Sequence, residues 1–541
     1  MRMGKTRAAA AALGLLLAGA AAAQQRPGED ELFGNAPPPP AQGSGPSAQA
    51  QPPPGAPGQG GAAGRDEAIL GAPAPQGAPA AAQAAQGPPP ALTPNENPLS
   101  IGGVAYLRLS TTWQEGVPPA DWTVLSPNLL DLYADARPND RVRAFVLGRL
   151  LYDPTQASSQ FAGAVPGVDA SGGGVTPFGG LAQKGGTQAL LDQLWVKFDV
   201  HHDVFVTAGK QHVKWGVGRF WNPTDYLHPV KRDPLAVYDT RTGTALVKAQ
   251  VPWESRGGNL YAVALFEDAA GKSAITTLGH VGAGGRVEMA LGTGEVGVDA
   301  LVQNGNKPRF GADVSVGVWD VDLYVEAALR PGVDFAPFVP DPSPPSTASY
   351  DQWKPGSTSG FTPQITVGGT WSHKYSDEDS LTVGAEYFYN EAGYSDPHVY
   401  SALLVAQVLP THYPGLPPGS YFTPFYLGKH YAAAFLNLPK PGSWNDWDFT
   451  VSVIGNLSDR TFIARLDTGV IVNTYLRVET FVAAHAGPAG GEFRLAFPAT
   501  TVPYQQATGL PPPYDHVPVN LAIPALAAPI LDAGVALRVT L

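Results

Sequence analysis

Long stretches of strictly alternating residues constrain the fold of this chain more than any other feature. From residue 99 onward apolar side chains recur at every second position, for example over 321–329, 381–389 and 531–541. Alternation with period two gives a β-strand two different faces. The runs cover about 10 to 13 residues, longer than the usual strand of about 5 to 6, and this length suits a tilted membrane crossing. We therefore predict an all-β fold, a transmembrane antiparallel β-barrel.

The connections between the runs alternate in length, as they do in outer-membrane barrels. Short links are expected near 138–140, 201–203, 253–257, 292–294, 319–320, 374–379 and 440–446. Long connections are expected near 116–126, 153–187, 216–241, 331–361, 393–428 and 486–529, and two links on the same side, 305–308 and 457–460, are short exceptions. Counting crossings gives about 18 strands, or 16 if one run has been split. An even number places both ends of the barrel on the periplasmic side.

The N-terminal region has a different composition and predicts two further segments. Arg2, Lys5 and Arg7 precede an apolar run over 8–20 and three alanines. This order is typical of a secretory signal peptide, here residues 1–23. Residues 24–98 consist mainly of Ala, Pro, Gly and Gln, which predicts a disordered periplasmic linker. The barrel then occupies residues 99–541, and the expected location is the outer membrane of a Gram-negative bacterium.

Two similar islands interrupt the predicted linker, one at 30–34 and one at 66–71. Each has an acidic pair, two bulky apolar residues and a glycine; the apolar residues are Leu32, Phe33, Ile69 and Leu70. The islands could dock on a periplasmic protein or on the cell wall, or they could recur by chance in a biased sequence.

Charge and cysteine content exclude several classes of protein. Lys and Arg number 34 against 46 Asp and Glu, a formal net charge of -12, which argues against nucleic acid as a partner. The chain has no cysteine, which excludes a disulfide scaffold and thiolate metal sites. Because no metalloprotease, nucleophile-elbow or P-loop motif is present, we expect neither a cofactor nor a bound metal, and we do not expect an enzyme.

Charged residues on the polar strand faces are the candidates for the barrel lumen. They are Arg141, Arg143 and Arg149 on one strand, Asp131 and Asp135 on its neighbour, and Arg465 with Asp467 and Arg477 with Glu479 further along. So many charges would be costly in a dry core, so we expect them to line a hydrated lumen. The alternative is that they pair across strands and fill the barrel.

One loop motif stands out after the run that ends near residue 214. It comprises Trp215, Gly216, Val217, Gly218, Arg219, Phe220, Trp221, Asn222, Pro223, Thr224 and Asp225. The glycines permit unusual backbone angles, and Asn followed by Pro favours a type I turn, so an ordered loop is predicted.

With the preceding residues 209–211, this motif resembles porin-like proteobacterial outer-membrane β-barrel proteins that carry W-G-x-G-R followed by N-P-T-D. The resemblance implies a barrel in the outer membrane and no particular solute. The chain departs from the common pattern by ending in Leu541, where an aromatic residue is usual.

The resemblance also implies a place for the third long loop, because porins fold that loop into the lumen as a constriction. Arg219, Lys231 and Arg232 would then put positive charge at the narrowest point, opposite acidic residues of the wall. The alternative is a solvated external loop held by a pair between Arg219 and Asp225.

Together these features predict a porin-like channel for passive or selective diffusion of small solutes. Its expected partners are outer-membrane lipid, lipopolysaccharide and the solutes, and association into oligomers is compatible with this class. A non-conducting structural or polymer-export barrel is one alternative. The other is an outer-membrane hydrolase whose site would be assembled from loop residues such as His228, His373 and His398.

Overall fold

The computed structural model describes residues 98–541, except 156–185, 240, 272–274, 377–378, 417–420, 508–515 and 524. The predicted signal peptide and linker, with Leu32, Phe33, Ile69 and Leu70, lie outside the described residues.

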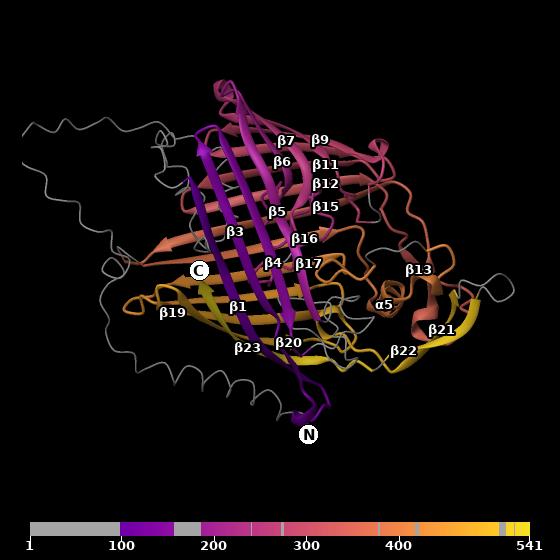
Figure 1. Ribbon diagram of the computed structural model, residues 1–541. Helices are drawn as coiled ribbons and strands as arrows, with labels where there is room; N and C mark the ends of the chain where they lie inside the picture. The colour runs from indigo at the N-terminus through magenta and orange to yellow at the C-terminus, as the bar shows by residue number, and fades with distance from the viewer. Residues whose placement is uncertain are drawn as a thin grey trace, which may run out of the picture.

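The described chain forms a closed antiparallel β-barrel (Figure 1). Its sheet has 19 strands, but β2 (Thr123–Leu125) is a three-residue strand beside one end of β1, so 18 strands build the barrel. These are β1 (Leu99–Gln114), β3 (Asn128–Asn139), β4 (Val142–Asp153), β5 (Gly186–Val200), β6 (Val204–Gln211), β7 (Thr244–Trp253), β8 (Gly258–Leu265), β9 (Gly282–Leu291), β10 (Gly294–Val302), β11 (Arg309–Val318), β12 (Val321–Pro331), β15 (Phe361–Lys374), β16 (Ser380–Asn390), β17 (His430–Pro439), β18 (Trp447–Asn456), β19 (Thr461–Asn473), β20 (Leu476–Ala486) and β23 (Pro529–Thr540). The prediction of about 18 strands is confirmed.

Pairing between the first and last strands closes the barrel. β1 pairs with β3 on one side and with β23 on the other, in a register that places Val104 opposite Thr540 and Leu107 opposite Leu537. Every other strand of the barrel pairs with its neighbours in the sequence. No strand edge is left open, as a membrane barrel requires.

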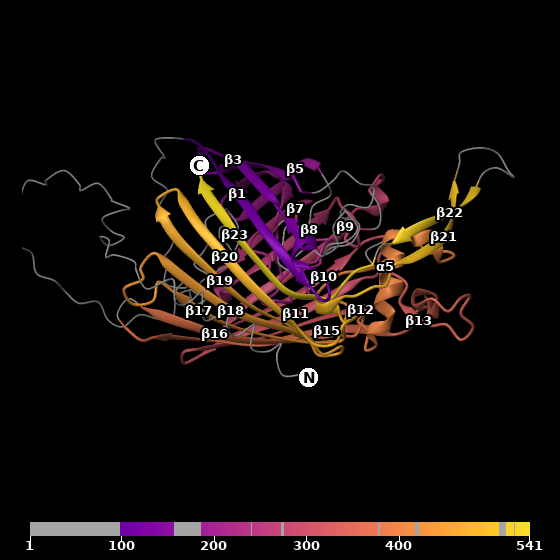
Figure 2. The same cartoon turned by 90° about the horizontal axis from the view of Figure 1, so that it is seen from below.

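The long connections all lie at one end of the barrel, where two short links, 303–308 and 457–460, also occur, and the connections at the opposite end are all short. We call the latter the turn end, where β23 finishes, and the former the loop end. The loop end carries additional short elements (Figures 1 and 2). These are η1 (Pro119–Asp121), η3 (Leu278–His280), β13 (Phe338–Pro340), η4 (Ser349–Gln352), β14 (Trp353–Pro355), η5 (Pro397–Val399), α5 (Tyr400–Val408), η6 (Pro410–His412), η7 (Glu492–Arg494), β21 (Thr500–Ala507) and β22 (His516–Ile523), while η2 (Glu254–Arg256) lies in a turn. No helix of the described residues is both long and apolar enough to span a membrane.

Three of the long connections fold together into one body, which we call the cap. It consists of the described parts of 331–361, 393–428 and 486–529, and one hydrophobic core joins its three parts. Val399 of η5 and Leu403 of α5 pack in this core with Phe338, Tyr350 and Phe497 from the other two connections. In Figures 1 and 2 the elements of the cap lie together beyond the loop end.

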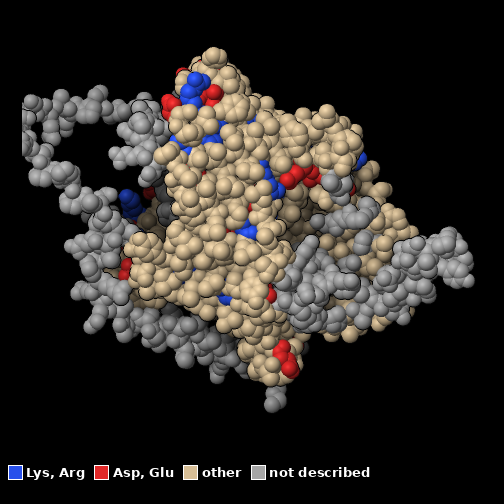
Figure 3. All heavy atoms as spheres, viewed as in Figure 1, with Lys and Arg blue, Asp and Glu red and all other residues tan. Residues whose placement is uncertain are grey.

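Burial along the strands is the reverse of that in a soluble protein. On β12 the apolar side chains Leu323, Val325 and Leu329 are exposed, whereas Glu326 between them is 0% exposed. The outer wall seen in Figure 3 accordingly shows few charged side chains over the barrel strands. Because an apolar exterior is stable only against lipid, the outer face of this barrel is a membrane-facing surface.

Candidate constriction loop

Apart from Arg141, the charged residues predicted for the lumen lie on the inner face of the wall, where they form ion pairs. Arg143 contacts Asp135 at 2.9 Å, and Arg149 contacts Asp131 at 2.8 Å and Asp192 at 3.2 Å. These contacts agree with the alternative prediction, in which the charges pair across neighbouring strands.

The other predicted charges are also paired. Arg465 contacts Asp467 at 2.6 Å, and Arg477 contacts Glu479 at 3.1 Å. Arg141 differs from the rest because it lies just before β4 at the turn end, where it is about half exposed and contacts Asp199 at 3.2 Å.

The described part of the connection between β6 and β7, residues 212–239 and 241–243, packs against the inner face of the barrel wall; we call it the inserted loop. Three apolar clusters attach it to different sectors of the inner wall. Trp215 packs with Leu246 of β7, and Trp221 stacks on Phe388 of β16 with ring centroids 5.6 Å apart. Tyr238 contacts Tyr106 of β1 with centroids 4.7 Å apart. The loop therefore crosses the lumen, and the alternative of a solvated external loop is wrong.

A glutamate of the barrel wall holds the first part of the motif. Glu326 of β12 accepts hydrogen bonds from the backbone N–H groups of Val217 and Gly218, both at 2.8 Å. Its second oxygen accepts from the N–H of Thr224 at 2.7 Å and from the Thr224 hydroxyl at 2.9 Å. Four donors thus surround one buried carboxylate, which compensates for its loss of hydration.

A second wall glutamate holds the middle of the motif. Glu386 of β16 accepts from the backbone N–H groups of Arg219 at 2.8 Å, Phe220 at 3.1 Å and Trp221 at 2.7 Å. The hydroxyl of Tyr324 donates to the same carboxylate at 2.7 Å. Two carboxylates, one on β12 and one on β16, therefore accept hydrogen bonds from six backbone N–H groups of the segment 217–224.

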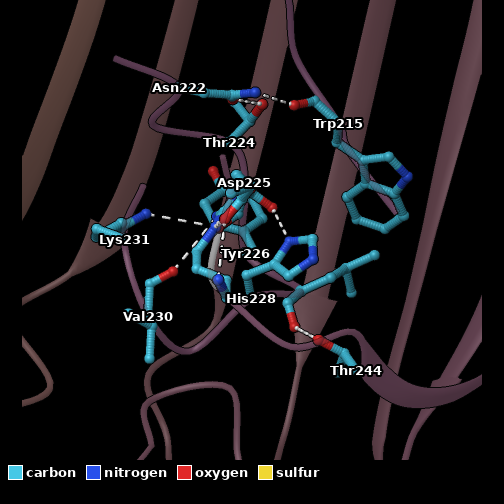
Figure 4. Close-up of polar contacts among 12 residues, drawn as sticks. Trp215, Asn222, Thr224, Asp225, Tyr226, His228, Val230, Lys231 and Thr244 are labelled. Atoms are coloured by element: carbon cyan, nitrogen blue, oxygen red, sulfur yellow. Dashed lines mark hydrogen bonds and ion pairs between the residues drawn. The ribbon is translucent and has the colours of Figure 1, made fainter. Parts of the chain in front are cut away.

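The glycines of the motif are required by this close approach. Gly216 has φ +82°, and a Cβ there would collide with the side chains of Thr224, Asn222 and Glu326. A Cβ at Gly218 would collide with the carbonyl oxygen of Trp221. Asn222 closes the turn through its Nδ2, which donates to the carbonyl oxygen of Trp215 at 2.5 Å (Figure 4). The ordered turn that the sequence predicts therefore directs its backbone N–H groups toward the carboxylates of the barrel wall.

Replacing Gly218 by Ala should displace the inserted loop, because crowding of this kind costs about 1–3 kcal/mol. We expect faster backbone hydrogen exchange over residues 215–228, measured by mass spectrometry on the detergent-solubilised protein. Gly148→Ala is the matched control, since a Cβ there meets nothing within 4 Å. Equal exchange in both variants would show that the tight fit at Gly218 does not hold the loop.

Asp225 organises the next part of the loop through contacts with His228 and Arg241 rather than with Arg219. His228 Nδ1 lies 2.7 Å from its carboxylate (Figure 4), and Arg241 Nη1 lies 2.8 Å from the same group. Burial alone would raise the pKa of Asp225, but His228 and Arg241 outweigh it and hold that pKa well below its usual range. Lys231 Nζ approaches the Asp225 carbonyl oxygen at 3.5 Å. The predicted Arg219–Asp225 pair is therefore replaced by pairs within the packed part of the loop.

The three predicted loop cations occupy different environments. Lys231 and Arg232 are half-buried, and Lys231 lies 6.0 Å from the centre of the Tyr426 ring. Arg219 has an exposed side chain, and its guanidinium lies 5.5 Å from the ring centre of Phe435 on β17. Sequence reasoning missed Glu326 and Glu386 as partners of the motif. The available signal was a carboxylate in the middle of each of two long alternating runs, on their polar faces.

In the parts of the chain that the structure describes, no three His, Asp or Glu side chains are grouped so as to hold a metal ion. Backbone donors, carboxylates and apolar packing hold the inserted loop.

A closed 18-strand barrel with an apolar exterior and a loop folded into its lumen defines a membrane β-barrel of the outer-membrane type. No protein-family model matches the chain, and no curated protein matches it significantly. Solved structures with a similar arrangement include OccAB4 of Acinetobacter baumannii, which is 7% identical, with 83% of this chain and 100% of that chain covered at a TM-score of 0.43. OprB of Pseudomonas putida is 10% identical, with 82% and 94% covered at 0.42. A mutant porin of Rhodopseudomonas blastica is 11% identical, with 82% and 100% covered at 0.35.

Proposed function

We propose that this protein is a porin-like outer-membrane channel for the diffusion of small solutes, with the inserted loop as its constriction. The observation that carries the proposal is the attachment of one loop to three sectors of the inner wall, through Trp215, Trp221 and Tyr238. A loop held in this way reduces the cross-section of the lumen at a fixed depth, and the charges near it then control which solutes pass.

The polar character of the inner wall supports passage of hydrated solutes. Ion-paired residues such as Arg143 with Asp135 and Arg477 with Glu479 lie on that wall, together with the hydroxyl pair of Ser372 and Thr382. A polar lumen within an apolar exterior is the arrangement of water-filled barrels. Membrane lipid and lipopolysaccharide are the proposed partners of the outer face.

Planar-bilayer recording tests this function directly. Purified protein whose unheated form migrates as a folded barrel should insert and give stable unitary current steps. Folded protein that inserts but remains silent would instead support the non-conducting structural barrel. The apolar clusters that pack the inserted loop against the wall are the observation that favours this second function.

A further inference from the structure

Arg219 lies beside two buried carboxylates and pairs with neither of them. Its own N–H group donates to Glu386, and the N–H of Gly218 donates to Glu326. Each carboxylate already accepts four hydrogen bonds, so neither has capacity left for the guanidinium. Among the residues that the structure describes, no Asp or Glu lies within ion-pair distance of the exposed Arg219 side chain.

Other arginines of the inner wall are neutralised. Arg286 contacts Glu288 at 2.6 Å, Asp299 at 2.8 Å and Asp313 at 2.6 Å. Arg538 contacts Glu479 at 2.6 Å. Arg219 differs from these arginines because backbone N–H groups and two hydroxyls, rather than an arginine, satisfy Glu326 and Glu386.

Aromatic rings complete the surroundings of Arg219. Its guanidinium lies 5.5 Å from the ring centre of Phe435, and the Phe220 ring lies 6.0 Å from the same ring. Both phenylalanines are half-buried. Asp322 of β12 interacts electrostatically with Arg219 without forming an ion pair. A guanidinium over a ring keeps its N–H edge available for a planar anion.

We infer that Arg219, Phe220 and Phe435 form a binding site for small carboxylates with an aromatic or apolar body. The carboxylate would accept hydrogen bonds from the guanidinium, and the body would pack on the two rings. The inference rests on the proposed function, because the solute reaches the site through the lumen, but binding is measured separately from conduction.

Calorimetric titration of the detergent-solubilised full-length protein with benzoate tests the site. Wild-type protein should bind benzoate more tightly than acetate and should not bind benzylammonium. Arg219→Gln should weaken benzoate binding about ten- to a hundredfold, the range expected for loss of a charged hydrogen-bond donor. Arg219→Lys, which keeps the charge and loses the planar fork, should be intermediate. Lys354→Gln, in the cap, should bind as the wild type does.

Benzoate affinity that is unchanged in folded Arg219→Gln protein would overturn the inference, as would equal binding of benzylammonium. If bilayers containing wild-type protein are silent while benzoate binding still depends on Arg219, the channel function fails and the binding site stands. If the channel conducts and Arg219→Gln binds benzoate normally, the site alone fails.

Discussion

Replacing Glu326 and Glu386 together by Gln should release the inserted loop, raise the unitary conductance and increase the current noise. Each Gln keeps one acceptor oxygen but turns an NH2 group toward backbone N–H donors of the segment 217–224. Each hydrogen bond to a charged group that is lost costs about 1.5–3 kcal/mol, so two substitutions remove most of the anchoring. The barrel itself should persist, because its strands pair independently of these side chains.

Bilayer recording in potassium chloride measures the conductance, and hydrogen exchange over residues 215–228 reports the release of the loop. Glu254→Gln is the matched control, since Glu254 is exposed in a turn remote from the motif. Unaltered conductance together with unaltered exchange in the double variant would show that the apolar clusters alone hold the loop. Each single variant should lie between the double variant and the wild type.

The second prediction is that the stability of the junction between the cap and the barrel rim depends on pH. Glu492 of η7 is 1% exposed and accepts hydrogen bonds from the N–H of Phe425, from the Tyr431 hydroxyl at 2.6 Å and from Asn456 Nδ2 at 2.7 Å. The N–H of Glu492 donates to Asp459 at 2.7 Å. Burial, and then the charge of Asp459, raise the pKa of Glu492 from 4.5 to about 8.

Because this pKa is higher in the folded than in the unfolded chain, the stabilisation is complete below pH 4.5 and is lost as the pH rises toward about 8. We therefore expect the cap to open more readily at pH 9 than at pH 6. Glu492→Gln, which mimics the protonated carboxyl, should remove this dependence. The measurement is the ratio of hydrogen-exchange rates over 486–500 between wild type and variant at each pH, since the intrinsic rates cancel. A ratio that is constant from pH 6 to 9 would contradict the assignment.

The barrel could be predicted from the sequence because its determinants are local. Alternation within each run identified the two faces of strands such as β12 and β16, and the lengths of the links identified the two ends of the barrel. The order of the loop motif also follows from Gly216, Gly218 and the Asn222–Pro223 pair.

The partners of the motif could not be predicted, because they lie across the lumen. Gly218 and Glu326 are 108 positions apart, and Trp221 and Glu386 are 165 apart. Periodicity indicates that a carboxylate faces inward but not which loop it meets. Similarly, Asp225 has Arg219, His228, Lys231 and Arg241 close in sequence, and only the path of the folded loop selects His228 and Arg241.

The barrel can close only when β1 pairs with β23. Val104 and Thr540 are joined in the closing seam, so the earliest strand remains without its partner until the last one has been delivered. Until then the chain exposes both an unpaired edge and the apolar side chains of its future outer wall, a combination that aggregates readily in water. Shielding of the incomplete chain until it inserts into a membrane is therefore a requirement of the topology itself.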